Sequence, residues 1–368
     1  MKYYLIAGEA SGDLHASNLM RYLKKEDANA QFRGFGGDKM EEQGLELVKH
    51  IREISFMGFV EVLTHLRIIF RNIRLCKKDI VEYKPDVVIL IDYPGFNLRI
   101  AEFAHDAGIK VFYYISPQVW AWKESRVKKI KRIVDRMFVI LPFEKEFYQG
   151  HDYNVDFVGH PMFDAIHHQN DTNYNFGLSD DRPIIAVLPG SRKQEISKGL
   201  PIMIKVLQQF PQYRFIIAGL TSISPDLYKK YAEGVDIEII YNKSTELLRI
   251  AKVALVTSGT ATLEAALIGI PEVVCYKGNA LSFFIAKNIV NIKYISLVNL
   301  IMDKFIVTEL IQNELSPKNL KLEFEKLLFD EQYVQTMLNG FEELKTKLGG
   351  RGASEKAASL MYRYLRDT

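Results

Sequence analysis

The sequence predicts an α/β protein made of two Rossmann-like domains, each with a doubly wound parallel sheet. Three observations support this fold class. Buried runs of aliphatic and β-branched residues alternate with amphipathic helical patterns along most of the chain. The 368 residues exceed what one compact core usually holds, and the composition, 48% hydrophobic and 25% charged, is that of a globular protein. A polar stretch, residues 167–182, separates two similar halves and is the best linker candidate.

The first half begins with a buried strand and continues with four more. Strands are expected at residues 3–7, 31–36, 87–91, 110–115 and 136–141. Helices are expected from the turn at residues 8–13 through residue 24, and over residues 98–106 and 124–134. Buried strands that alternate with amphipathic helices are typical of a parallel sheet covered on both faces.

The second half repeats this order. Strands are expected at residues 184–188, 214–218, 235–240, 253–256 and 272–276, with helices between them and a helical pattern after Ser316. We expect an N-terminal domain at residues 1–170 and a C-terminal domain at residues 171–348, with a ligand cleft between them at the carboxyl ends of the strands. The glycines near residue 350 separate a last helix, residues 349–368. This helix is expected to pack back on the N-terminal domain of its own chain or, in a possible homodimer, of a partner.

Composition excludes several classes of protein. The net charge of +3 gives no electrostatic support for nucleic-acid binding. The two cysteines, Cys76 and Cys275, supply neither a disulfide framework nor a metal cluster, which fits a reducing cytosol. No apolar run approaches the ~20 residues that span a bilayer, and the N-terminus leads into a strand rather than a signal peptide. We therefore expect a soluble or peripheral protein.

Two strand–turn–helix motifs in the second half predict an anion site. The turns follow the strands at residues 184–188 and 253–256 and open helices, whose free N–H groups and positive end attract phosphate. An arginine in one motif can bind phosphate oxygens and a glutamate in the other can accept from ribose hydroxyls, so a nucleoside diphosphate fits the pair. The residues concerned are Gly190, Ser191, Arg192, Ser258, Gly259, Thr260 and Glu264. The alternative is that the small residues only allow helix and strand to pack closely.

Asp92 ends an apolar strand and is the candidate general base, because a carboxylate at the carboxyl end of a central strand faces the cleft of such a fold. The alternative is a turn former or helix N-cap. The loop at residues 8–13 lacks the G-x-G-x-x-G spacing and carries Glu9 and Asp13, so it suits a hydroxyl-bearing substrate better than a phosphate. His15 nearby is either catalytic or a packed residue.

Residues 57–75 predict a basic amphipathic helix that could lie in a membrane interface. Its apolar positions include Phe59, Val62, Leu66, Ile69, Phe70 and Ile73. Its basic stripe includes Arg67, Arg71 and Arg74. The alternative is a surface helix whose apolar face belongs to the core. Trp120 and Trp122 precede a basic run. They either anchor the protein at an interface or stack on the face of a sugar, and the alternative is that they are packed aromatic residues.

Ordered motifs lie along nearly the whole chain, at residues 8–13, 91–97, 117–122, 141–144, 158–161, 189–192 and 258–264. Together they resemble the motifs of the bacterial lipid-A-disaccharide synthases. The resemblance implies a two-lobed GT-B fold with an acceptor- and membrane-facing first lobe and a UDP-sugar-binding second lobe. It implies transfer of 2,3-diacylglucosamine from UDP-2,3-diacylglucosamine to 2,3-diacylglucosamine 1-phosphate, which yields the β-1,6 disaccharide 1-phosphate and UDP. It also implies no metal or other cofactor, and a cytoplasmic enzyme peripheral on the inner membrane of a Gram-negative bacterium.

The resemblance also assigns site residues. Asp92 would take the proton of the acceptor hydroxyl, with Glu9, Ser11, Asp13 and Asn97 on the acceptor side. Asn299, Glu309 and Gln312 would join the donor site, although Thr308 stands where the family pattern has Pro and residues 302–304 replace a more Gly-rich stretch. Two other classes remain: a UDP-sugar 2-epimerase-like isomerase of the same fold, and a non-enzymatic lipid-binding protein that keeps a nucleotide fold.

Overall fold

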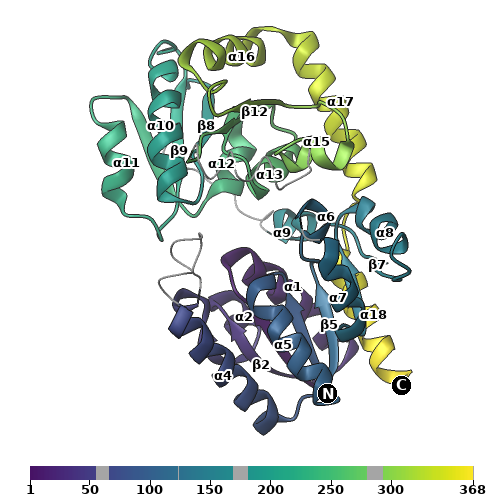
Figure 1. Ribbon diagram of the computed structural model, residues 1–368. Helices are drawn as coiled ribbons and strands as arrows, with labels where there is room; N and C mark the ends of the chain where they lie inside the picture. The colour runs from purple at the N-terminus through teal and green to yellow at the C-terminus, as the bar shows by residue number, and fades with distance from the viewer. Residues whose placement is uncertain (55–65, 123, 169–180, 280–292, 368) are drawn as a thin grey trace. The chain divides into compact units, whose positions relative to one another are not determined.

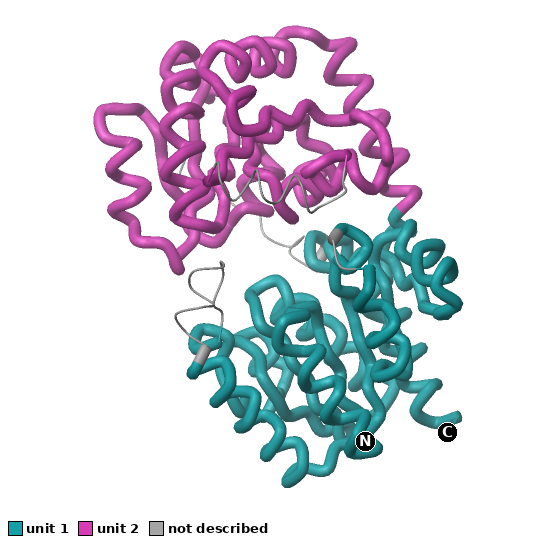
Figure 2. The backbone as a smooth tube through the Cα atoms, viewed as in Figure 1, with its two compact units in different colours: residues 1–168, 348–368 teal, residues 169–347 magenta. Residues whose placement is uncertain are grey.

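The chain folds into two compact units, each built on its own parallel sheet (Figure 1), which confirms the predicted fold class. The computed structural model describes residues 1–54, 66–122, 124–168, 181–279 and 293–367. Unit 1 comprises Met1–His168 and Leu348–Thr368, and unit 2 comprises Gln169–Lys347 (Figure 2). The last residues of the chain therefore belong to the same unit as the first.

Unit 1 contains a seven-stranded parallel sheet in the order β3-β2-β1-β4-β5-β6-β7. The strands are β1 (Lys2–Ala7), β2 (Gln31–Gly36), β3 (Leu45–His50), β4 (Val87–Ile91), β5 (Lys110–Tyr114), β6 (Arg136–Val139) and β7 (Asp156–Phe157). The central strands β1 and β4 are almost wholly buried, because aliphatic runs on both faces of a strand require cover on both sides. The sequence analysis missed β3 and β7. The first is a partly exposed edge strand that mixes charged and apolar residues, and the second has only two residues.

The helices of unit 1 cover both faces of its sheet. They are α1 (Ala10–Glu26), α2 (Asp38–Glu42), α4 (Leu66–Tyr83), α5 (Pro94–Asp106), α6 (Val119–Trp122), α7 (Val127–Ile133), α8 (Pro142–Gln149), α9 (Met162–His168) and α18 (Ala353–Arg366). Two 3-10 turns, η1 (Ile51–Glu53) and η2 (Glu124–Arg126), join them. Helices α4, α5 and α7 pack on one face through a shared hydrophobic core, and α1 lies beside α18 (Figure 1).

Helix α18 is held at its N-terminus by a residue almost two hundred positions away in the chain. The buried Asp164 carboxylate accepts hydrogen bonds from the backbone N–H groups of Gly352 and Ser354, both at 2.8 Å. It thus supplies the cap that the glycine-rich turn before α18 lacks. In this structure the last helix packs on the N-terminal unit of its own chain.

Unit 2 contains a six-stranded parallel sheet in the order β10-β9-β8-β11-β12-β13, which is the Rossmann order. The strands are β8 (Ile184–Leu188), β9 (Arg214–Gly219), β10 (Ile237–Tyr241), β11 (Ala251–Val256), β12 (Glu272–Tyr276) and β13 (Thr308–Ile311). The helices are α10 (Lys193–Leu207), α11 (Pro225–Ala232), α12 (Ser244–Ile250), α13 (Thr260–Ile268), α15 (Leu297–Met302), α16 (Pro317–Phe329) and α17 (Glu331–Lys347). The short strand β13 was not predicted. The carboxyl ends of the parallel strands share one edge, and this edge carries the candidate donor site.

Candidate functional site

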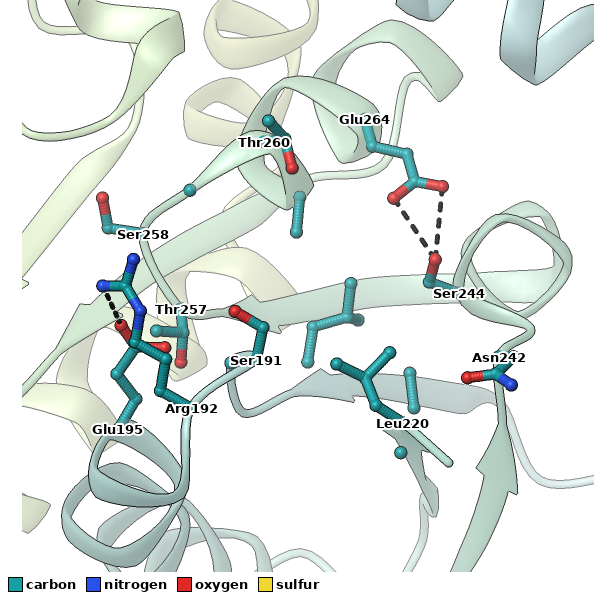
Figure 3. A pocket seen from close by; sticks show the side chains of 16 residues that line it. Ser191, Arg192, Glu195, Leu220, Asn242, Ser244, Thr257, Ser258, Thr260 and Glu264 are labelled. Atoms are coloured by element: carbon teal, nitrogen blue, oxygen red, sulfur yellow. Dashed lines mark hydrogen bonds and ion pairs between the residues drawn. The ribbon is translucent and has the colours of Figure 1, made fainter. Parts of the chain in front are cut away.

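Unit 2 has a pocket of about 280 Å³ at the carboxyl edge of its sheet (Figure 3). Its walls come from the ends of β8, β9 and β11, the residue after β10, and the starts of α10, α12 and α13. Every residue of the two predicted anion motifs lines it, namely Gly190, Ser191, Arg192, Ser258, Gly259, Thr260 and Glu264. The structure therefore brings together two motifs that lie almost seventy residues apart in the sequence.

The turn after β8 can be formed only with glycine at position 190. Gly190 has φ +106°, and a Cβ atom there would lie 2.7 Å from Glu195 Oε2. This tight turn leads into α10, with Arg192 as its N-cap residue. Arg192 donates from Nη1 to Glu195 Oε1 at 3.2 Å, while more than half of its side-chain surface is exposed. A cation and the positive end of a helix thus face the same pocket.

Glu264, on α13, is buried at 9% exposure and is oriented by two hydroxyl groups. Ser244 Oγ donates to Glu264 Oε2 at 3.3 Å, and Thr245 Oγ1 donates to Oε1. Burial raises the pKa of Glu264 above its ordinary value, and the hydrogen bonds from Thr245 and Ser244 oppose that rise. Ser244 and Thr245 were not singled out in the sequence, because hydroxyl residues at a helix start normally indicate only a cap.

The labelled side chains show how charged and polar groups are distributed in the pocket. Arg192 and Ser258 lie on one side, and Asn242, Ser244 and Glu264 lie on the other (Figure 3). Asn242 Nδ2 donates to Thr221 Oγ1 at 2.8 Å, which fixes this side chain. One side of the pocket therefore carries the Arg192–Glu195 ion pair, and the other carries the Glu264 carboxyl group.

Asn299 and Glu309 support this pocket rather than line it. Asn299 is fully buried, and its amide binds Glu309 Oε1 at 2.9 Å and the backbone of residues 306–307. Glu309 also accepts from the backbone N–H groups of Ile295 and Ser296, each at 3.0 Å. Ser258 Oγ donates to the Ile295 carbonyl at 2.8 Å, so the network holds the loop that forms one wall. The described contacts show a supporting role, and direct contact of Asn299 and Glu309 with the donor stays a prediction.

Gln312 follows β13 and has φ +53°. Its backbone N–H donates to the Tyr276 carbonyl at 2.8 Å, which extends the ladder between β12 and β13. Its Nε2 atom is buried and has no hydrogen-bond partner among the described residues. Gln312 does not line the pocket that the described residues form, and its contact with the donor stays a prediction.

In unit 1, Asp92 and Glu9 come together at the carboxyl ends of β4 and β1. Asp92 is half-buried in the turn between β4 and α5. Burial and the negative charge of Glu9 raise the pKa of Asp92 to about 7, while a backbone hydrogen bond from Tyr93 lowers it. A carboxyl group with this pKa exchanges protons near neutral pH, and such shifts are typical of functional sites.

Of the other three residues expected on the acceptor side, one is exposed and two are buried and bound to backbone groups. Ser11 is exposed in the first turn of α1. The buried Asp13 carboxylate accepts from the N–H groups of Gly37, Lys39 and Met40, so it caps α2. Asn97 is fully buried and donates to the carbonyls of Ile91 and Asp92. These contacts show Asp13 and Asn97 supporting the backbone, and their direct contact with a substrate stays a prediction.

The structure favours the packed alternative for His15 and Trp120. His15 is buried, and burial lowers its pKa to about 4, so it is a packed neutral residue. Trp120 Nε1 donates to Glu144 Oε1 at 3.3 Å, and its ring meets Phe143 edge to face at 4.9 Å. Among the described residues, no group of three or more His, Cys, Asp or Glu side chains is placed to hold a metal ion.

The helix expected over residues 57–75 is described from Leu66 onward and continues to Tyr83 as α4. Phe59 and Val62 lie outside the described residues, as does the side chain of Leu66. Ile73 is 6% exposed in the core and Ile69 packs against that core, which corrects their assignment to a membrane-facing surface. Phe70 is 49% exposed, and the three basic residues Arg67, Arg71 and Arg74 are exposed. Within the described part of the chain, no helix combines the length and hydropathy needed to cross a bilayer.

Relatives with curated names cover nearly the whole chain. A lipid-A-disaccharide synthase of Trichlorobacter lovleyi is 40% identical over 366 residues, which are 97% of this chain and 96% of that protein. The protein of the same name from Geobacter sulfurreducens is 37% identical over 370 residues, 98% of this chain and 96% of that protein. The family model described as lipid-A-disaccharide synthetase matches residues 3–361.

Solved structures agree on the fold. A UDP-GlcNAc 2-epimerase from Neisseria meningitidis, bound to UDP-GlcNAc, is 13% identical and covers 100% of both chains with a TM-score of 0.69. The glycotransferase of kitacinnamycin is 15% identical and covers 98% of both chains with a TM-score of 0.65. At such identities the likeness establishes only the GT-B fold, whereas the family match extends from end to end and confirms the resemblance seen in the motifs. The chain therefore belongs to the lipid-A-disaccharide synthetase family of glycosyltransferases.

Proposed function

We propose that this protein is an inverting glycosyltransferase that moves 2,3-diacylglucosamine from UDP-2,3-diacylglucosamine to 2,3-diacylglucosamine 1-phosphate. The products are the β-1,6-linked disaccharide 1-phosphate and UDP. The observation that carries the proposal is Asp92, a half-buried carboxyl group whose pKa is raised to about 7. A base with a pKa near the working pH is both ionised and able to hold a proton, which is what abstraction from a sugar hydroxyl requires.

In the proposed reaction, Asp92 accepts the proton of the acceptor's 6-hydroxyl while that oxygen attacks the anomeric carbon of the donor. The bond between the anomeric carbon and the diphosphate oxygen breaks on the opposite face, so the configuration at that carbon inverts. The electron pair of the broken bond leaves with UDP. The raised pKa of Asp92 increases its driving force as a base over that of an ordinary carboxylate.

The pocket of unit 2 supports the donor half of this proposal. The side that carries Arg192 suits the diphosphate, where Arg192 and the helix start at Thr260 stabilise the charge of the leaving group. Glu264, on the side opposite Arg192, suits the ribose hydroxyls, and the neighbouring part of the pocket near Asn242 suits the base. Ordered in this way, a UDP moiety places its phosphates at the arginine.

We also propose that the protein works at the inner membrane as a peripheral enzyme. Both substrates carry acyl chains, and at about 0.8 kcal/mol per buried CH₂ they stay in the lipid phase. Phe70 and the arginines Arg67, Arg71 and Arg74 form an exposed apolar and basic surface on α4 that suits an anionic bilayer.

One experiment separates transfer from isomerisation. Purified protein is incubated with UDP-2,3-diacylglucosamine alone and then with the acceptor added. A transferase consumes the donor only when the acceptor is present and yields a β-linked product, which NMR coupling at the anomeric proton identifies. Consumption of the donor alone to a 2-epimer would instead establish an isomerase, and an α-linked product would overturn inversion. Binding of both lipids without any conversion would leave only a lipid-binding protein.

A further inference from the structure

The turn that carries Asp92 has an unusual backbone. Asp92 has φ +44° and Tyr93 has φ +48°, so two consecutive residues with Cβ atoms occupy the left-handed region. Such residues are uncommon singly, and they persist only where surrounding contacts hold them. The direction of the Asp92 side chain is set by this backbone, so whatever holds the turn also sets the position of the carboxylate.

Two buried side chains hold the peptide between Asp92 and Tyr93. The carbonyl oxygen of Asp92 accepts from Tyr113 Oη at 2.6 Å and from Asn97 Nδ2 at 2.7 Å. Both donors are fully buried, one on β5 and the other in the first turn of α5. A carbonyl oxygen has two lone pairs, so these two bonds satisfy it and fix the orientation of the peptide plane.

The Tyr93 side of the turn is held separately. The Tyr93 ring packs directly against Gly8 at the end of β1, where a Cβ atom would lie 2.2 Å from Tyr93 Cγ. Tyr93 Oη donates to the Ile54 carbonyl at 2.9 Å. Contacts from Gly8 after β1, from β5, from α5 and from Ile54 thus converge on one strained dipeptide.

We propose that Tyr113 and Asn97 are positioning residues, which hold the Asp92–Tyr93 peptide in its left-handed conformation and so direct the Asp92 carboxylate toward the acceptor hydroxyl. In this proposal both residues act through Asp92 rather than on the substrate. The inference rests on the proposed role of Asp92 as the base. Without one of these hydrogen bonds the turn relaxes toward an ordinary φ, and the carboxylate leaves the geometry needed for proton transfer.

The first test compares Tyr113→Phe with Tyr153→Phe. Tyr153 is also buried in unit 1, and its hydroxyl donates to the Val134 carbonyl at 3.0 Å, so each variant loses one tyrosine–carbonyl hydrogen bond. We expect Tyr113→Phe to lower kcat by about 10-fold or more, because small misplacements of a reacting group are costly. Its KM values and UDP affinity should stay within about twofold of wild type, because only the stabilisation of the transition state is lost. Tyr153→Phe should retain wild-type kcat.

The second readout is the pH profile. The groups that act on Asp92 are Glu9 and the backbone of Tyr93, and those that act on Tyr113 include Tyr148 and Arg126. In the wild type, the acidic limb of kcat/KM should follow the Asp92 pKa of about 7. A carboxylate released toward water regains an ordinary pKa, so the limb should move to lower pH in Tyr113→Phe and not in Tyr153→Phe. A general loss of stability would not move this limb.

Asp92→Ala in the same assays separates the two hypotheses. If Asp92→Ala is inactive while Tyr113→Phe and Tyr153→Phe have the same kcat and pH profile, the positioning role is overturned. The proposed role of Asp92 as the base is then still supported. If Asp92→Ala keeps turnover, the proposed function fails and the positioning role fails with it. Should Tyr113→Phe not fold, Asn97→Ser tests the other donor, and wild-type kcat with an unmoved acidic limb would contradict the proposal.

Discussion

Glu9 and Asp92 set the pH range of the proposed reaction. Asp92 must be ionised to act as a base, and its pKa of about 7 means that the active form is lost as pH falls through neutrality. We therefore expect kcat/KM to fall about tenfold per pH unit below that value. In Glu9→Gln the neighbouring negative charge is gone, so the pKa of Asp92 falls and the acidic limb moves to lower pH. An unmoved limb in steady-state kinetics from pH 5 to 9 would show that Glu9 does not act on Asp92.

Arg192 is the side chain on which the donor diphosphate depends most. It is exposed in a pocket that two helix starts line, and it carries charged hydrogen-bond donors. Arg192→Ala should weaken UDP binding by about 1.5–3 kcal/mol, or about 10- to 150-fold in Kd, measured by calorimetry. Arg351→Ala, which removes an exposed arginine of unit 1, is the control and should bind UDP as the wild type does. Equal affinities in the two variants would remove Arg192 from the site.

Among the elements, α4 has two kinds of apolar side chain that should respond differently. Phe70 is exposed, so Phe70→Ser should weaken binding to anionic phospholipid vesicles by about fivefold without lowering Tm. Phe329→Ser, at a phenylalanine of unit 2 with 63% exposure, is the matched control and should not change vesicle binding. Ile73→Ala should instead destabilise the fold by about 2–4 kcal/mol, because it opens a cavity in the core. Sedimentation with vesicles that finds no difference between Phe70→Ser and Phe329→Ser would contradict a membrane role for this surface.

Helix α18 depends on a cap from outside its own segment. Asp164→Ala removes the acceptor for two backbone N–H groups at the start of α18, so unfolding should become easier by about 1–2 kcal/mol. Hydrogen exchange in the first turn of α18 should quicken. Glu355→Ala, at an exposed acidic residue of the same turn, serves as the control. Identical exchange in the two variants would show that Asp164 does not hold the helix.

Across the whole molecule, the sequence predicted elements well where burial leaves a strong pattern. The central strands of both sheets are continuous aliphatic runs, so most were located to within a residue or two at each end. The edge strand β3 and the short strands β7 and β13 were missed, because an edge exposes one side and two to four residues show no periodicity. Sequence motifs likewise identified both anion-binding turns, because glycine, hydroxyl and arginine residues stand together there.

The remaining features of the candidate site depend on tertiary contacts that no local pattern reveals. Asp13 and Asn97 are polar residues beside a candidate base, yet their hydrogen bonds go to backbone groups of other elements. Asn299 and Glu309 likewise bind each other across ten residues. In the sequence, Tyr113 is an aromatic residue of a buried strand with no sign of a special role. Only the pairing of β5 with β4 brings its hydroxyl group to the Asp92 carbonyl.

The central claim is that Asp92 supplies the base and that unit 2 binds the nucleotide independently of it. The most direct test measures turnover and UDP affinity together in Asp92→Asn, which keeps the size of the side chain. We expect kcat to fall by at least about 100-fold while the Kd for UDP stays within about twofold of wild type. Turnover close to wild type, or a loss of UDP affinity as large as the loss of turnover, would contradict the account.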